Sequence, residues 1–268
     1  MPSKTRRQVQ KIIRRLKSAL IQPLKVKDVH VFYRLSDGSY DKSKPPYITN
    51  ENCLRNFVQQ FGEARVHLIA DNVRDSTWNN IRTTYPALRC DRTSFGNGAA
   101  SFNHALDLAL KLPSDEGVYF VEDDYLHRAG SYSVLVEGLE LGIDYVTLYD
   151  CPDTYDGENT PRYFEEVNPT VEGGGEITQV FLTKTCHWKL TNSATMTFAS
   201  TVKMLRKDEV VLRKWTAKTH PQSFWMFMEL REAGRSLVNP LPGFATHGEN
   251  KWLCPLVDWS SVAYDENC

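Results

Sequence analysis

The chain has 268 residues, of which 41% are hydrophobic and 24% are charged, and its formal net charge is −1. This composition is typical of a folded globular protein, and the near-neutral charge gives no electrostatic case for nucleic-acid binding. No apolar run approaches the roughly 18 residues that a membrane span needs, and we recognise no signal-peptide pattern. Six scattered cysteines form no CxxC pair. They indicate neither a zinc site nor a disulfide framework, so we expect a cytoplasmic protein.

Residues 1–27 differ from the rest of the chain. They hold nine lysines and arginines and no acid, and apolar side chains recur in them at helical spacing. This pattern predicts a basic amphipathic N-terminal helix or extension over 1–27. Such a helix either contacts an anionic membrane surface peripherally or packs on the body with its basic face in solvent. Residues 28–268 show no internal repeat or linker, and we expect them to form a single domain.

The body alternates apolar strand patterns with amphipathic helix patterns. This order favours the α/β class, with a mostly parallel central sheet flanked by helices. A long segment rich in proline, glycine and acids, 150–177, is expected to be a loop. Strands are expected at 29–33, 65–70, 118–121, 145–149, 178–183, 194–198 and 236–238, and helices at 49–61, 76–85, 100–112, 131–141, 201–214 and 220–234.

Three consecutive carboxylates follow the apolar strand 118–121: Glu122, Asp123 and Asp124. Adjacent carboxylates repel one another unless a cation or solvent compensates their charge. Mg²⁺ and Mn²⁺ prefer oxygen ligands and often bridge to phosphate oxygens. We therefore predict a metal–diphosphate site at this strand end, and the alternative is a solvated acidic turn.

Two other polar features are predicted to lie at the same edge of the sheet. Asp71 ends the second strand, and the loop 97–103 opens a helix. A carboxylate at such a strand end can accept hydrogen bonds from a base or a ribose, and a helix start offers free N–H groups to an anion.

The segments 95–106 and 119–124, taken together, resemble the glycosyltransferases of the GT-A fold. Those enzymes have a small-residue loop, an asparagine on the following helix and a strand that ends in a DXD motif. The resemblance covers most of residues 29–250. It implies a Rossmann-like GT-A fold and transfer of a sugar from a nucleoside-diphosphate sugar to a hydroxyl of a glycan, glycolipid or glycoprotein.

The resemblance also implies roles for individual residues. Asp124 would bind Mn²⁺ or Mg²⁺, and Asp123 would face the ribose or the water shell of the metal ion. Glu122 stands where the motif often has aspartate. The segment 242–247 looks like the last part of the same fold, which makes His247 the second metal ligand. The donor-binding residues would be Arg34, Ser36, Asp37, Asp71, Asn97, Asn103, Glu122 and Asp123.

Inverting transfer needs a general base. Many inverting relatives supply an acid near the start of the helix before the final strand, but this chain has none at 220–223. We assign the base to His220, whose ordinary pKa is near neutrality. Retaining transfer, which does not need this base, is the alternative to the inverting transfer that we expect. Other bases that the sequence offers are Glu229, Asp153 and Asp156.

His187 and Trp188 are predicted to lie on a turn between two strands. Sugar faces stack on aromatic rings, so we interpret this pair as acceptor-binding, with core packing as the alternative for the indole.

Two other functions compete with glycosyl transfer. A nucleotidyltransferase shares the strand-end acids, but its usual glycine-rich basic loop is only weakly matched by residues 34–38. A catalytically inactive, nucleotide-sugar-binding relative would explain the absence of an acidic base.

Overall fold

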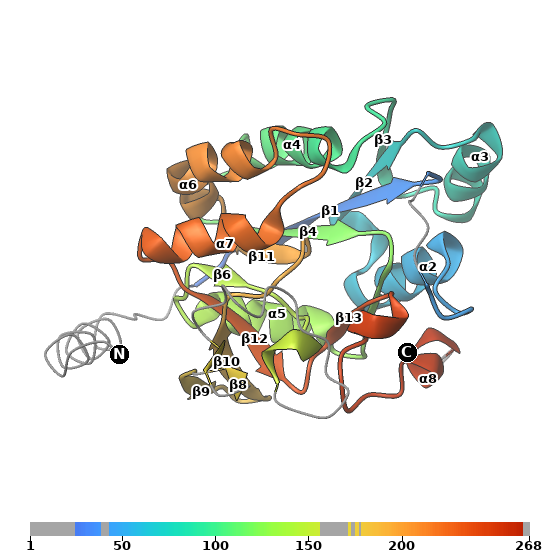
Figure 1. Cartoon of the computed structure of the whole chain (residues 1–268). Coiled ribbons are helices and arrows are strands. Elements are labelled where there is room, and N and C mark those ends of the chain that lie inside the picture. The colour runs from blue at the N-terminus through green and yellow to red at the C-terminus, as the bar shows by residue number, and fades with distance from the viewer. Residues whose placement is uncertain (1–24, 39–42, 156–170, 173–174, 177, 265–268) are drawn as a thin grey trace, which may run out of the picture.

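The computed structural model describes residues 25–38, 43–155, 171–172, 175–176 and 178–264. The strands of its main sheet are β1 (Val29–Ser36), β2 (Val66–Asp71), β3 (Arg89–Thr93), β4 (Gly117–Glu122), β6 (Tyr145–Val146), β9 (Val180–Leu182), β10 (His187–Thr191), β11 (Phe198–Thr201) and β12 (Leu237–Leu241). Within the described residues they form one nine-stranded sheet in the order β3-β2-β1-β4-β11-β6-β12-β10-β9 (Figure 1).

Most strands of this sheet run in one direction. β1 pairs in parallel with β2 and β4, β2 with β3, and β6 with β12. β11 is antiparallel to both of its neighbours, and so is β10. The predicted α/β class with a mostly parallel sheet is therefore confirmed. The register places Ser36 beside Asp71 and Arg34 beside Glu122, so the carboxyl ends of β1, β2 and β4 meet at one edge.

Helices cover both faces of the sheet. They are α2 (Asn50–Phe61), α3 (Asp75–Thr84), α4 (Gly98–Ala109), α5 (Ser131–Glu140), α6 (Val202–Trp215), α7 (Ser223–Glu232) and α8 (Trp259–Tyr264). In Figure 1, α4, α6 and α7 lie on one side of the sheet and α2 and α5 on the other. Side chains alternate between the two faces of a strand. On β4, Phe120 accordingly joins the core beneath α4 and α6, whereas Tyr119 and Val121 join the core beneath α2 and α5.

Side-chain caps fix the starts of several helices. Thr49 Oγ1 accepts from the backbone N–H of Asn52 at 3.1 Å, and this satisfies one of the unpaired donors at the start of α2. Thr201 caps α6 in the same way. α7 begins at Ser223 rather than at the predicted residue 220. Pro221 explains the difference, because a residue before proline is disfavoured in the helical region.

A two-stranded ribbon that we did not predict joins distant parts of the chain. β5 (Tyr125–His127) pairs antiparallel with β13 (Ala245–His247), and His247 lies opposite Tyr125. Strands of three residues are too short to show a period of two in the sequence. The ribbon nevertheless brings the C-terminal part of the chain to the acidic end of β4.

Several sequence predictions meet the limits of the described residues. Residues 1–24 lie outside them, so the N-terminal helix over 1–27 stays a prediction. In the part of the loop 150–177 that is described, β7 (Val171–Glu172) pairs with β8 (Gly175–Glu176). The strand β3 was missed because its sequence is polar, as suits an edge strand. Among the described residues, no helix has the length and apolar character to cross a bilayer.

Candidate active site

The three predicted carboxylates do follow the end of β4. Glu122 is the last residue of the strand, and Asp123 and Asp124 lead into β5. Asp123 Oδ2 accepts a hydrogen bond at 2.8 Å from the backbone N–H of Ser36, the last residue of β1. Because β1 and β4 are parallel neighbours, the end of β1 and the acids form one polar edge.

Asp124 and His247 lie side by side although they are far apart in the sequence. Asp124 Oδ2 is 3.4 Å from His247 Nε2, and both side chains are largely buried. The same carboxylate oxygen is 3.2 Å from the ammonium of Lys44. The two residues that we assigned to the metal therefore meet at one point, and a lysine that we did not assign joins them.

Two features hold His247 against Asp124. The imidazole lies next to the ring of Tyr125, with the ring centroids 5.4 Å apart. At Gly248, a Cβ atom would lie 2.5 Å from the backbone oxygen of Asp124 and 2.5 Å from Ile48 Cγ2. Real Cβ atoms do not approach backbone that closely, so this position requires glycine for the two chain segments to meet.

Arg34 neutralises the first of the three acids. Its guanidinium is buried and donates at 3.0 Å to Glu122 Oε1 and at 3.0 Å to the backbone oxygen of Gly98. It also lies over the ring of Phe102, 5.7 Å from the centroid. The longer side chain of Glu122 thus forms a charge-assisted bond with β1, while Arg34 ties the acidic edge to the start of α4.

The remaining two acids are strongly coupled. Burial, followed by the negative charge of Asp124, raises the pKa of Asp123 to about 7, while the hydrogen bond from the Ser36 backbone acts in the opposite direction. Adjacent carboxylates of this kind favour any cation that binds between or beside them.

Asp71 has a different contact from the one that we predicted. Its Oδ1 accepts from Thr93 Oγ1 at 2.9 Å and from the Phe95 N–H at 2.7 Å, and its Oδ2 accepts from the Gly96 N–H at 3.0 Å. The carboxylate is buried and holds the loop before α4. These contacts show that Asp71 shapes the loop at the site, and its donor-binding role stays a prediction.

Asp37 and Asn97 also bind the chain itself. Burial alone would raise the pKa of Asp37, but hydrogen bonds from Arg74 and Thr77 outweigh it and lower that pKa. Asn97 Oδ1 caps α4 by accepting from the Ala100 N–H at 2.8 Å. Both side chains position the segments around the acids, and their donor-binding roles stay predictions.

Asn103 also has partners within the chain. Its Nδ2 donates at 3.0 Å to the backbone oxygen of Thr216, and its Oδ1 accepts at 3.1 Å from the Thr216 hydroxyl. These bonds join α4 to the end of α6. Asn103 therefore fastens two helices together, and its donor-binding role stays a prediction.

The two predicted catalytic residues are placed differently. His220 is exposed in the connection between α6 and α7, whose Thr219 oxygen accepts from the Ala99 N–H at the start of α4, at 3.3 Å. Glu229 instead accepts from Lys214 Nζ at 2.6 Å and Trp215 Nε1 at 2.7 Å. The hydrogen bond from Lys214 lowers the pKa of Glu229. This carboxylate fastens α6 to α7, and its assignment as a base stays a prediction.

The acceptor prediction for Trp188 is wrong in its structural premise. His187 and Trp188 begin strand β10 rather than a turn, and the indole is fully buried. The Trp188 ring packs so closely on Gly138 that a Cβ atom there would lie 2.5 Å from it. Its N–H donates to Thr183 Oγ1 at 3.1 Å. Core packing therefore occupies Trp188, whereas His187 remains exposed. Of the remaining alternative bases besides Glu229, Asp153 is buried and Asp156 lies outside the described residues.

Sequence reasoning missed Lys44 and the segment before β11. Thr197 Oγ1 accepts from the Glu122 N–H at 3.2 Å, and Thr195 Oγ1 is hydrogen-bonded to the hydroxyl of Tyr125. Lys44 precedes two prolines and carries no period or motif. Neither feature had a sequence signal, because only the folded sheet brings them to the acids.

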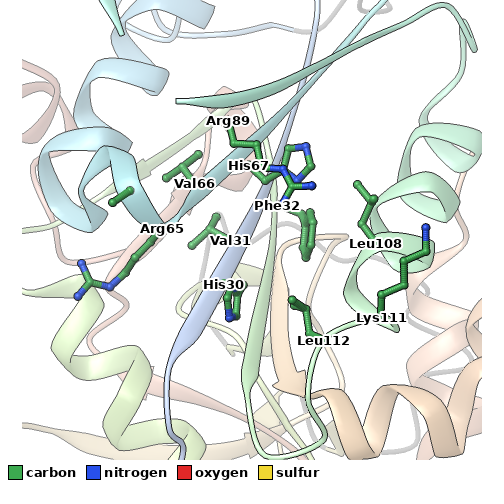
Figure 2. Close-up of a pocket in the computed structure, with 11 residues that line it drawn as sticks. His30, Val31, Phe32, Arg65, Val66, His67, Arg89, Leu108, Lys111 and Leu112 are labelled. Atoms are coloured by element: carbon green, nitrogen blue, oxygen red, sulfur yellow. The ribbon is translucent and has the colours of Figure 1, made fainter. Parts of the chain in front are cut away.

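A cavity of about 360 Å³ lies at the other end of the strands. Figure 2 shows His30 and Val31 of β1, Val66 and His67 of β2 and Arg89 of β3 beside the end of α4. These residues begin their strands, whereas the acids follow the ends of β1, β2 and β4. The cavity is therefore separate from the acidic edge.

The donor atoms at Asp124 fit a divalent metal ion that is also held by a ligand. Within the described residues, no group of three or more His, Cys, Asp and Glu side chains is arranged for a metal. Asp124 and His247 supply one carboxylate and one imidazole, 3.4 Å apart. Mg²⁺-type sites commonly use one or two carboxylates plus phosphate oxygens and water. The pair fits such an ion.

No model of a known protein family matches the chain, and no curated protein matches its sequence. Among solved structures, GalNAc-T7 with UDP, GalNAc and Mn²⁺ is 10% identical, with a TM-score of 0.53, and the match covers 84% of this chain and 44% of that one. The chain has the GT-A fold. It spans less than half of the GalNAc-T7 chain, so the likeness concerns one fold within a longer protein.

Two further solved structures are similar at lower scores. TarS 1–349 of S. aureus with UDP-GlcNAc is 12% identical, covering 68% of this chain and 48% of that one, with a TM-score of 0.41. CMP:2-keto-3-deoxy-manno-octonic acid synthetase with CTP is 11% identical, covering 81% and 92%, with a TM-score of 0.43.

Proposed function

We propose that this chain is a metal-dependent glycosyltransferase that moves a sugar from a nucleoside-diphosphate sugar to a hydroxyl of a glycan or glycoconjugate. The observation that carries the proposal is the meeting of Asp123, Asp124 and His247 at the carboxyl edge of a GT-A sheet. In open α/β sheets, ligands bind at this edge. The solved GalNAc-T7 structure contains UDP and Mn²⁺, which makes this pair the first ligands to test.

In this proposal the metal ion is Mn²⁺ or Mg²⁺, and it is held by Asp124 and His247. When bound, it supplies Lewis-acid chemistry that neutralises the charge of the leaving diphosphate. The two side chains are already oriented by β5, β13 and the glycine at 248, so little ordering is required on binding.

Donor binding is assigned to groups at the ends of β1 and β4. Ser36 holds Asp123 through its backbone N–H, and Arg34 neutralises Glu122. These contacts leave Asp123 and Asp124 as the carboxylates nearest the proposed ion, with the Lys44 ammonium beside Asp124. Asp71, Asp37 and Asn97 support the surrounding loops.

We assign inverting transfer with His220 as the proton acceptor. His220 precedes Pro221, whose Cδ would lie 3.6 Å from a Cβ at Gly98, and Gly98 is bonded to Arg34. The imidazole is therefore on a segment that borders the start of α4, and it is exposed to solvent. Peripheral membrane contact through residues 1–27 stays part of the proposal.

The first experiment measures the binding of UDP, other nucleoside diphosphates and nucleotide sugars with and without Mn²⁺. A ligand that binds the folded state raises its stability, by about 2.7 kcal/mol at a concentration of 100 Kd. We expect Asp124→Asn to abolish the Mn²⁺-dependent binding of the nucleoside diphosphate. Asp115→Asn is the matched control, because Asp115 is exposed before the start of the same strand, β4. Unchanged calorimetric affinity in the Asp124 variant would contradict the metal assignment.

Product analysis separates the alternatives. A glycosyltransferase releases a nucleoside diphosphate from a nucleotide sugar, whereas a nucleotidyltransferase releases pyrophosphate from a nucleoside triphosphate. A chain that binds the nucleotide sugar with Mn²⁺ but releases neither product under any acceptor condition would be the inactive relative.

A further inference from the structure

Lys44 lies on a segment that is fastened across the acidic edge. The backbone oxygen of Ser43 accepts from the Asn250 N–H at 2.8 Å, and the Ser43 hydroxyl accepts from the Asn250 side chain at 2.8 Å. Further along, the Ile48 N–H donates to Pro45 at 3.0 Å, and the buried Ile48 side chain abuts Gly248. The segment is thus attached on both sides of Lys44 to chain that also carries His247.

This attachment places the ammonium against the metal-site carboxylate. Lys44 Nζ is 3.2 Å from Asp124 Oδ2, and the two side chains are 21% and 5% exposed. His247 Nε2 is 3.4 Å from the same oxygen. One oxygen atom is therefore shared by a cation of the chain and by the imidazole that we assign to the metal.

Each acid at the carboxyl edge has its own partner, and Lys44 is the partner of Asp124. Arg34 offsets Glu122, and the Ser36 N–H hydrogen-bonds Asp123. Lys44 offsets Asp124. A divalent ion on Asp124 Oδ2 would lie within a few ångströms of the ammonium, and two cations at that distance in a partly buried site repel each other strongly. The ammonium and the ion therefore compete for this oxygen.

We propose that Lys44 is a resident counter-cation of Asp124, and that a divalent metal ion must displace it to bind. The inference rests on the proposed function, in which the ion binds Asp124. It adds that Lys44 lowers the affinity for the metal alone. A nucleoside diphosphate that enters with the ion gives the displaced ammonium a new anionic partner. Metal and diphosphate therefore bind cooperatively, and each raises the affinity of the other by the same factor.

The first test titrates the full chain with Mn²⁺ alone and counts free ion by electron paramagnetic resonance. Lys44→Met keeps the length of the side chain and removes its charge, and we expect it to bind Mn²⁺ at least fivefold more tightly than the unmodified chain. Lys44→Arg and Lys207→Met should stay within about twofold. Lys207 is exposed on α6, so its variant has the same charge change away from the acids. Equal or weaker Mn²⁺ binding by Lys44→Met would overturn the proposal.

The second test follows Lys44 itself, by residue-resolved acetylation and mass spectrometry. Saturating Mn²⁺ should increase the labelling rate of Lys44 at least threefold in the unmodified chain. Asp124→Asn should increase it without metal, and Asp115→Asn should not. No change at Lys44 in the Asp124 variant would overturn the pairing.

The two tests separate this inference from the proposed function. If Mn²⁺ binds Asp124 but Lys44→Met binds it no better, the counter-cation inference fails and the glycosyltransferase proposal stands. If neither the unmodified chain nor Lys44→Met binds Mn²⁺, with or without UDP, the metal role fails and the displacement fails with it.

Discussion

Two lysine–aspartate pairs lie at the same edge of the sheet with the same separation, yet they differ in everything around them. Lys189 Nζ is 3.2 Å from Asp150 Oδ1, as Lys44 Nζ is from Asp124 Oδ2. Asp150 also accepts from the Tyr155 hydroxyl at 2.5 Å and the Asn239 amide at 2.9 Å. Lys189 donates to Thr154 at 2.6 Å.

The comparison separates a buried structural pair from the partly exposed pair that we propose to be functional. The Lys189–Asp150 pair is almost completely buried and is surrounded by neutral hydrogen-bond donors and acceptors that fix it in place. Asp124 is flanked instead by an ammonium with some exposure and by an imidazole. In our proposal a metal ion displaces the ammonium and shares the imidazole. Equal distance therefore does not imply equal role.

The largest expected effect is on stability. Lys189→Met leaves Asp150 as a buried charge without its cation, and breaking such a pair typically costs about 3–5 kcal/mol. Lys44→Met should cost less, because the Lys44 side chain is 21% exposed and that of Lys189 is 4% exposed. Urea unfolding of both variants measures the difference. Equal losses would remove the distinction between the two pairs.

Each aspartate has a glycine against it, and these glycines provide the next test. At Gly243 a Cβ would lie 3.1 Å from Asp150 Cβ and 2.5 Å from Cys254 Sγ, and at Gly248 it would lie 2.5 Å from the Asp124 oxygen. We expect either alanine variant to lose about 1–3 kcal/mol from overpacking. Only Gly248→Ala should also weaken Mn²⁺ binding, by tenfold or more, because it separates Asp124 from His247. Equal Mn²⁺ affinities in the two variants would contradict this.

The buried residue His127 allows the effect of burial on a pKa to be measured through the pH dependence of stability. His127 is fully buried, its ring accepts or donates at 2.9 Å with the Tyr119 hydroxyl, and burial lowers its pKa to about 3. Below the ordinary histidine pKa of about 6.5, His127 is protonated in the unfolded chain but stays neutral in the folded chain. The neutral His127 therefore does not reduce the free energy of unfolding above pH 6.5. Its effect lowers the free energy of unfolding as the pH falls from 6.5 to 3.

The slope is about 1.4 kcal/mol per pH unit, because the difference is one proton. His127→Gln should lower stability at pH 7.5 but lose this extra dependence between pH 6.5 and 5.5. The check is urea unfolding of both chains across that range. Identical pH slopes would show that His127 is protonated in the folded chain.

The smallest expected effect concerns a third lysine–carboxylate pair. Lys214 Nζ is 2.6 Å from Glu229 Oε2, but both side chains are well exposed, at 56% and 31%. Exposed pairs typically contribute 0–1 kcal/mol, so Glu229→Gln should barely change stability. It should also leave turnover within about twofold, whereas His220→Ala should reduce kcat by about 100-fold. A larger loss in the Glu229 variant than in the His220 variant would restore Glu229 as the base.

The sequence patterns identified the acidic edge because the end of a strand depends mainly on the local sequence. A β-branched run followed by polar residues predicts a strand and its end, and parallel strand ends share an edge. The same patterns could not assign roles to Asn97 or Asn103, since one amide can cap a helix, fasten two helices or bind a ligand with equal propensity. Only the partners in the fold decide between these roles.

Lys44 and Trp188 show two other limits. Lys44 reaches Asp124 through contacts between segments about 80 residues apart, which leave no period in the chain. The polar residues around Trp188 favoured a turn, but the strand pairing of β10 with β12 turns the indole into the core. Tertiary packing overrides local composition at both positions.

The ribbon of β5 and β13 has a consequence for how the protein matures. During synthesis the N-terminal part of a chain emerges first, so the acids at 122–124 leave the ribosome more than 100 residues before His247 does. Until β13 arrives, the nascent chain carries the carboxylates without the imidazole. A product truncated before residue 245 therefore lacks His247, one of the two residues of the proposed ion site. An incomplete chain of this kind cannot form that site.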